Sequence, residues 1–370
     1  MAILVNSPVI STYIFIIIFL VVVLATIRRK GTQEFFSATV SQELKGLAIL
    51  MIIFGHIGYF LANDHRFLFP LSISAGVGVN LFLLLSGYGL ATSSFRQTIS
   101  IKQFYQKRLL KLFIPFWLVL VFFLALDYFV WRHTYSWAYI TRSFLGLFPS
   151  ADLSTDLNSP LWYFSLILFY YLIFPLLFSK KYYYLSALLI YIISYILLRN
   201  DPSYFVKVIH LYKVHLLAFP LGLLLGGLYF KRSALNKLIK IVKDILHKPS
   251  PSRIISYYIF FFTLLLVVGY TAYHSNVDTE PLKEQLTSLL TLLAILIVFL
   301  IKKFDLKLFS LFGWCSYEIY LLHWPILYRY DLFYKYLPAW LATILYLILF
   351  IFLSWLLKRV SSLFVYKSKG

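Results

Sequence analysis

Two ionisable residues stand on a strongly apolar segment: Lys45 and, eleven residues later, His56. Eleven helical residues make almost three turns, so both side chains fall on one stripe, separated by roughly 16 Å of helix rise. That is about half the hydrocarbon core of a bilayer. An ionisable group at such a depth is costly unless it faces a protein or water-filled interior, so we interpret His56 as functional. The alternative is a neutral histidine hydrogen-bonded to a neighbouring helix.

A buried imidazole favours its neutral form, which can accept a proton from an attacking hydroxyl group. Asn63 follows His56 by seven residues on the same stripe, near the expected outer mouth of the helix. Lys45, His56 and Asn63 therefore define a polar line from one membrane surface to the other. The sequence predicts that His56 activates an alcohol.

The next apolar segment places small and amide side chains on one face: Gly76, Asn80, Gly87 and Ala91. Small residues allow close approach of a neighbouring helix or of a ligand, and the pattern favours neither.

A basic cluster follows, in which Arg108 and Lys111 lie one helical turn apart with Lys107 beside them. Such a cluster suits a ligand with several phosphates, of which coenzyme A is one, because each cation can engage a separate oxygen. The alternative is a basic flank that fixes topology and touches lipid phosphate.

A second intramembrane histidine, His323, shares a stripe with Ser316 and Tyr320. Glu318 lies about 140° round the helix from His323, so the two are not an i, i+4 pair. Glu318 has two open interpretations: it orients an imidazole of another helix, or it is protonated and hydrogen-bonded within the bundle.

The segment from Trp131 to Trp162 is rich in aromatic residues, including Tyr135, Trp137 and Tyr139. These rings suit stacking on sugar faces, and they equally suit an aromatic belt at the membrane interface.

Composition identifies the class of protein. Of the 370 residues, 61% are hydrophobic, 20% aromatic and only 13% charged, and the mean hydropathy is +0.82. These values indicate an all-α polytopic membrane bundle. We expect about eleven spans, over residues 8–27, 44–62, 74–93, 112–130, 161–178, 183–198, 214–230, 254–273, 286–301, 308–328 and 339–357.

Charge distribution predicts the orientation. If the N-terminus lies outside, 25 of the 34 Lys and Arg residues, Lys45 included, fall on the cytoplasmic side and 9 outside. The positive-inside rule therefore favours an outer N-terminus and a cytoplasmic C-terminus. The net charge of +20 is then a topology signal and an attraction to anionic lipids, not a nucleic-acid footprint, since no basic soluble domain carries it.

We expect residues 1–30 to be a retained extra N-terminal anchor and residues 31–370 to be the main membrane domain, with no soluble domain. The basic segment Lys231–Arg253 is typical of a short amphipathic helix. Cys315 is the only cysteine, so the sequence holds neither an intrachain disulfide nor a cysteine-based metal site, and we expect no metal.

At these residues the chain resembles the membrane-bound acyltransferase-3 family, which O-acylates surface polysaccharides and related carbohydrates. The resemblance covers about residues 40–357, and its motifs are, in chain order, Lys45 to His56, Phe82–Gly89, Arg108–Lys111 before Ile114-Pro115-Phe116-Trp117, Leu161–Phe164 with Phe174-Pro175-Leu176, and Ser316–Pro325. Lys45 and Lys111 replace arginines of the family pattern and lose the bidentate fork. Asn80 stands where many members carry an acidic residue, and the acidic pair common in the fourth motif is absent.

The resemblance implies a transmembrane O-acyltransferase of a bacterial cytoplasmic membrane, which we expect to be an O-acetyltransferase. Cytosolic acetyl-CoA would be the donor, held by Lys45, Lys107, Arg108 and Lys111, and a carbohydrate or lipid-linked glycan presented outside would be the acceptor. His56 would be the base, directly or through an acyl-enzyme, with Glu318 and His323 as further catalytic candidates.

Oxyanion stabilisation would need a hydroxyl donor, for which Ser86, Tyr88 and Tyr317 are candidates. The rival interpretation is a transporter or flippase for a lipid-linked glycan or small anion, with His56, Glu318 and His323 as a proton relay. The absence of internal repeats in the sequence counts against this rival.

Overall fold

The computed structural model describes residues 3–30, 36–61, 64–97, 100–153, 155–205, 207–231, 251–275 and 281–367. About 78% of the chain is helical, which confirms the all-α class. The helices and strands are α1 (Pro8–Ala25), β1 (Ile27–Arg29), α2 (Ala38–Tyr59), α3 (Ala75–Arg96), α4 (Ile101–Trp131), α5 (Trp137–Phe144), α6 (Trp162–Leu177), α7 (Tyr183–Arg199), α8 (Ile209–Val214), α9 (Ala218–Lys231), α11 (Pro251–Tyr273), α12 (Pro281–Ile301), β2 (Phe304–Leu306), α13 (Lys307–Trp314), α14 (Ser316–Pro325) and α15 (Ala339–Lys367).

Nine helical segments of the described chain are long and apolar enough to cross a membrane, so the protein is a multi-pass membrane protein. The expected number of eleven is not confirmed. Helix α7 is shorter, with 17 residues. The expected span 308–328 is interrupted at Cys315, whose backbone leaves the helical region between α13 and α14.

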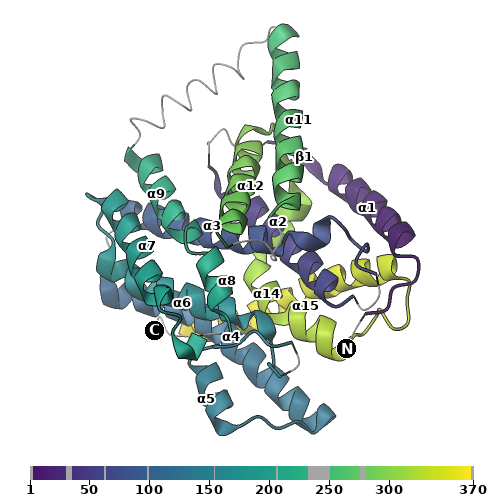
Figure 1. Ribbon diagram of the computed structural model, residues 1–370, viewed down its shortest axis with the longest axis vertical. Coiled ribbons are helices and arrows are strands. Elements are labelled where there is room, and N and C mark those ends of the chain that lie inside the picture. The colour runs from purple at the N-terminus through teal and green to yellow at the C-terminus, as the bar shows by residue number, and fades with distance from the viewer. Residues whose placement is uncertain are drawn as a thin grey trace.

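Helices α2 and α3 form the centre of the bundle, and α1 and α11 lie at its edges (Figure 1). Glycines allow the central contacts. A Cβ atom on Gly46 of α2 would lie 1.8 Å from the Phe309 carbonyl oxygen of α13, and one on Gly87 of α3 would lie 2.3 Å from the Phe219 carbonyl oxygen of α9. Close packing against α9 therefore explains Gly87 without a ligand.

Helix α4 begins earlier than the expected span, because the Ser100 hydroxyl accepts a hydrogen bond from the Gln103 backbone N–H at 3.3 Å. The whole basic cluster therefore belongs to one continuous helix of 31 residues, about 46 Å long. We call the end of the bundle that carries Lys45, Lys107, Arg108 and Lys111 the basic end. We call the opposite end the loop end; it carries residues 132–153, which include α5, and residues 155–161.

A short antiparallel pairing of β1 with β2 joins the two halves of the chain at the basic end. Beside it, the fully buried Glu43 carboxylate lies 2.8 Å from the Lys302 ammonium group and accepts a hydrogen bond from Leu306 N. Lys302 also donates to the Phe304 carbonyl oxygen. The pair therefore fixes α2 to the segment before α13. Most of the expected amphipathic segment 231–253, and Asn63, lie outside the described residues.

Candidate active site

Two imidazole rings from distant parts of the sequence meet inside the bundle. His56 on α2 and His323 on α14 place Nδ1 and Nε2 2.7 Å apart. Their rings are nearly parallel, with centroids 5.0 Å apart and an interplanar angle of 6°. His323 is completely buried, whereas His56 is only partly buried. The structure thus brings together the two histidines that the sequence singled out.

The backbone fixes the tautomers of this pair. His323 Nδ1 lies 2.9 Å from the Tyr320 carbonyl oxygen and 3.1 Å from that of Ile319. A carbonyl oxygen can only accept, so His323 Nδ1 carries hydrogen and, in the neutral ring, His323 Nε2 is an acceptor. His56 Nδ1 must then donate. These hydrogen bonds leave the lone pair of His56 Nε2 unused, which suits a general base.

Aromatic side chains hold the His56 ring in place. The Trp324 indole meets it edge to face, with centroids 4.7 Å apart. A cavity of about 20 Å³ lies beside the ring, enough for one water-sized group such as a hydroxyl. It is lined by Ile52, His56, Val79, Phe82, Pro160, Trp162, Tyr163 and Tyr320.

A larger cavity of about 210 Å³ opens toward the basic end. It is lined by Lys45, Phe82, Ser86, Arg108, Lys111, Leu112, Tyr163, Ile167, Tyr171, Ser316, Tyr317 and Tyr320. Three of the four predicted donor-binding cations therefore meet around one space. A third cavity of about 370 Å³ adjoins it through Arg108 and Lys111, and adds Lys107 and Lys180.

The 210 Å³ cavity and the His56 cavity share three side chains: Phe82, Tyr163 and Tyr320. Tyr163 and Tyr320 meet edge to face at 5.4 Å, and the Tyr320 hydroxyl donates to the Pro160 carbonyl oxygen at 2.8 Å. These three rings therefore form the constriction between the two spaces. Through shared lining residues the three cavities form a series from the basic end to His56.

The candidate hydroxyl donors separate into two groups. Ser86 and Tyr317 line the 210 Å³ cavity, although the Tyr317 hydroxyl already donates to the Leu112 carbonyl oxygen at 2.5 Å. Tyr88 packs instead against Phe36 and Tyr229 and lines none of the three cavities. Ser86 is the candidate best placed by the structure.

Glu318 lies in the first turn of α14 and is buried. In the described part of the chain no hydrogen bond joins it to His56 or His323: the two rings bond to each other, and His323 Nδ1 bonds to the backbone.

Asn80 belongs to a buried polar group that the sequence did not reveal. Its amide nitrogen donates to Ser288 Oγ at 2.6 Å, and its oxygen lies 2.7 Å from His215 Nδ1. The His215 ring stacks on Trp162, which lines the His56 cavity. Bonding within the bundle therefore accounts for Asn80. The available signal for His215 was a third histidine inside an expected apolar span, 214–230.

Comparison with known proteins gives one match. The family described as an acyltransferase domain matches residues 44–359. Neither a search of curated proteins nor a search of solved structures gave a match. The matched range contains both histidines, the three cavities and the basic cluster.

Proposed function

Since the chain belongs to the acyltransferase-3 family, we propose that this membrane acyltransferase moves an acetyl group from cytosolic acetyl-CoA to a hydroxyl of a cell-surface carbohydrate. O-antigen, exopolysaccharide and similar glycans are the acceptor class. The observation that carries the proposal is the series of three cavities that share lining residues, with Lys107, Arg108 and Lys111 at one end and an imidazole with a lone pair at the other.

The donor would bind at the basic end. Lys107, Arg108 and Lys111 are spaced to engage separate phosphate oxygens, and Lys45 lies further along the same path. The pantetheine arm would occupy the 210 Å³ cavity and bring its thioester to the constriction at Phe82. A long arm that combines methylene groups with amides suits this space, because its wall combines rings and aliphatic side chains with serine and tyrosine hydroxyls.

The acceptor hydroxyl would arrive from the loop end and enter the His56 cavity. His56 Nε2 takes its proton while the hydroxyl oxygen attacks the thioester carbonyl carbon. The C–S bond then breaks, and the departing thiolate takes the proton from the imidazolium. The Ser86 hydroxyl is the proposed donor to the transient oxyanion. A route through an acylated His56 uses the same lone pair first as nucleophile.

We propose further that the basic end faces the cytoplasm of a bacterial cell, with the N-terminus outside, and that residues 1–30 are an added anchor. Little of α1 is buried, 17% of its apolar window, which supports a peripheral role.

The test uses the protein in nanodiscs with radiolabelled acetyl-CoA and surface glycans freed of their O-acetyl groups by mild alkali. Wild type should transfer label, and His56→Ala should not. His65→Ala is the matched control, because His65 is exposed at the loop end. Transfer that persists unchanged in His56→Ala contradicts the assigned role. Glycan movement across proteoliposomes without label transfer would indicate a transporter instead.

A further inference from the structure

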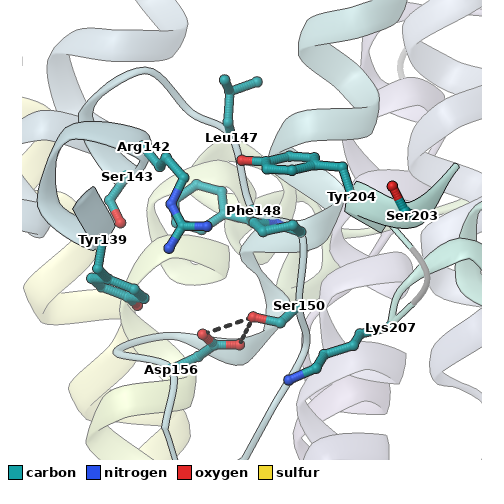
Figure 2. A pocket seen from close by; sticks show the side chains of 11 residues that line it. Tyr139, Arg142, Ser143, Leu147, Phe148, Ser150, Asp156, Ser203, Tyr204 and Lys207 are labelled. Atoms are coloured by element: carbon teal, nitrogen blue, oxygen red, sulfur yellow. Dashed lines mark hydrogen bonds between the residues drawn. The ribbon is translucent and has the colours of Figure 1, made fainter. Parts of the chain in front are cut away.

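A separate pocket lies at the loop end, between α5, the segment 147–150 and the residues Ser203, Tyr204 and Lys207 (Figure 2). Its volume is about 270 Å³, near the lower limit of ligand sites in proteins and suited to one sugar unit. None of its lining residues lines the three cavities that lead to His56. The lining residues are Tyr139, Arg142, Ser143, Leu147, Phe148, Pro149, Ser150, Asp156, Ser203, Tyr204 and Lys207.

Three aromatic rings contribute to the wall: Tyr139, Phe148 and Tyr204. Tyr139 is held firmly, because its ring stacks on Tyr135 at 4.8 Å and its hydroxyl accepts a hydrogen bond from Leu157 N at 2.9 Å. Aromatic faces next to hydroxyl groups form amphipathic surfaces, which suit the C–H faces and the hydroxyls of a sugar ring.

The charges of the pocket are unequal. The Asp156 carboxylate is buried, and its oxygens already accept from the Ser150 hydroxyl at 2.9 and 3.0 Å and from Asp152 N at 2.8 Å. Among the described residues, Arg142 donates a side-chain hydrogen bond from Nε alone, to the Ala138 carbonyl oxygen at 3.1 Å. Lys207 is exposed and makes no hydrogen bond in the described part of the chain. Two cations therefore face one carboxylate in this pocket, which leaves a net positive charge for a negatively charged ligand.

The pocket is linked to the His56 cavity through a short segment of chain. Asp156 lines the pocket, whereas Pro160 and Trp162, a few residues later, line the His56 cavity. The Tyr212 hydroxyl bridges both places, since it lies 3.4 Å from the carbonyl oxygens of Phe148 and Trp162. A chain molecule held in the pocket is therefore bound beside the wall of the His56 cavity.

From these observations we infer that this pocket binds an anionic saccharide, a sugar unit that carries a carboxylate or phosphate, and thereby selects the acceptor; the inference rests on the proposed function. Arg142 and Lys207 would bind the anionic group, and Tyr139 and Tyr204 would contact the sugar. Neighbouring uncharged units of the same chain would then present their hydroxyls to His56.

The test measures binding without any acyl donor. The full-length protein in phosphatidylcholine nanodiscs is titrated with trigalacturonic acid and, separately, with its neutral methyl ester. Trigalacturonic acid should bind at least tenfold more tightly than the ester, and this advantage should shrink at high salt because exposed charges are screened. Equal affinities would overturn the inference.

Charge variants assign the effect to the pocket. The double variant Arg142→Gln with Lys207→Gln should lose roughly tenfold or more of the affinity for trigalacturonic acid. Arg142→Lys keeps the positive charge but loses the bidentate guanidinium group, so its affinity should lie between those of wild type and the double variant. Lys335→Gln, an exposed cation at the same end but outside the pocket, should bind like wild type. Unchanged affinity in the double variant would overturn the inference even where the fold is preserved.

Two further measurements separate competing explanations. Nanodiscs with one-third phosphatidylglycerol should still bind trigalacturonic acid; if the lipid abolishes binding, the pocket is a headgroup site and the inference fails. His56→Ala should retain binding. If the protein transfers acetyl groups but does not bind trigalacturonic acid, the inference about the pocket is wrong and the proposed function stands. If the protein binds trigalacturonic acid as expected but transfers no acetyl group, the proposed function is wrong and the inference about the pocket stands.

Discussion

His56 Nδ1 lies 2.7 Å from His323 Nε2, and His323 is in turn anchored to the carbonyl oxygen of Tyr320 at 2.9 Å. This chain of hydrogen bonds directs the single unused lone pair of the two rings to His56 Nε2. It also gives the two histidines unequal roles. His56 contacts the cavity, whereas His323 holds His56 in one tautomer and orientation.

The unequal roles predict different kinetics for His323 variants. His323→Ala removes the acceptor of His56 Nδ1, so we expect kcat for acetyl transfer to fall on the order of a hundredfold with little change in KM for acetyl-CoA. His323→Gln offers an amide oxygen as acceptor and should recover part of the loss. Steady-state kinetics in nanodiscs, with thermal unfolding as a fold control, check this. A rise in KM alone would contradict the positioning role.

The basic cluster predicts a donor-binding defect. Arg108 lines both the 210 Å³ and the 370 Å³ cavities. Arg108→Gln should therefore raise KM for acetyl-CoA about tenfold, because a charge-assisted contact to phosphate is lost. Lys102→Gln is the matched control, an exposed cation on the same helix that lines neither cavity. Lys45→Arg restores the bidentate guanidinium group of the family pattern and should lower KM for acetyl-CoA by a few fold. Equal effects of Arg108→Gln and Lys102→Gln would point to general surface charge.

Much of the fold was predictable because apolar length and helical spacing are local properties. The segments around α2, α3 and α4 were located from composition, and the one-turn spacing of Arg108 and Lys111 holds on α4. The break at Cys315 was not predicted, because no proline stands between Lys307 and Trp324 to mark the end of a helix. Serine caps, such as Ser100, extended helices beyond their apolar cores.

The site was predictable in its residue types and not in its contacts. His56 and His323 are separated by 267 residues, so their hydrogen bond depends on how α2 and α14 pack. The same holds for Tyr88, which shares a motif with Ser86 yet faces Phe36 and Tyr229. Adjacent helical residues point in directions about 100° apart, so motif membership alone does not place a side chain in a cavity.

The constriction predicts control of acyl length. Phe82 stands between the 210 Å³ cavity and the His56 cavity, so Phe82→Ala should admit a longer acyl chain to the reacting position. We expect the kcat/KM ratio of butyryl-CoA to acetyl-CoA to rise roughly tenfold. Leu83→Ala is the control, since Leu83 is buried but lines neither cavity. The measurement is kcat/KM with acetyl-, propionyl- and butyryl-CoA for wild type and both variants. An unchanged ratio in Phe82→Ala would show that the constriction lies elsewhere.

The buried ion pair at the basic end predicts a stability effect. Glu43→Gln leaves the buried Lys302 ammonium without its countercharge and should lower the free energy of unfolding by about 3–5 kcal/mol. Glu43→Leu combined with Lys302→Met removes both charges and should cost less than Glu43→Gln alone. Lys303→Met, next in the chain but exposed, should change stability by about 1 kcal/mol or less. Chemical unfolding in mixed micelles measures these differences. A double variant less stable than the single one would show that the pair itself is net stabilising.

The loop-end pocket predicts a pH dependence of stability. Burial outweighs the hydrogen bonds from Asp152 N and Ser150 and raises the pKa of the Asp156 carboxyl above its ordinary value. Between the unfolded pKa, about 3.9, and this raised value the folded protein binds more protons than the unfolded chain. The stabilisation from Asp156 is therefore complete below the unfolded pKa and is lost as pH rises through the folded pKa, with a slope of at most about 1.4 kcal/mol per pH unit.

Asp156→Asn should remove this pH-dependent stabilisation, so the difference in unfolding temperature between wild type and variant should vary between the two pKa values and level off above the folded one. Scans from pH 4 to pH 8 measure the difference, with Asp201→Asn, an exposed aspartate, as control. A difference that stays constant over the whole range would show that Asp156 titrates in the folded protein as it does in the unfolded chain.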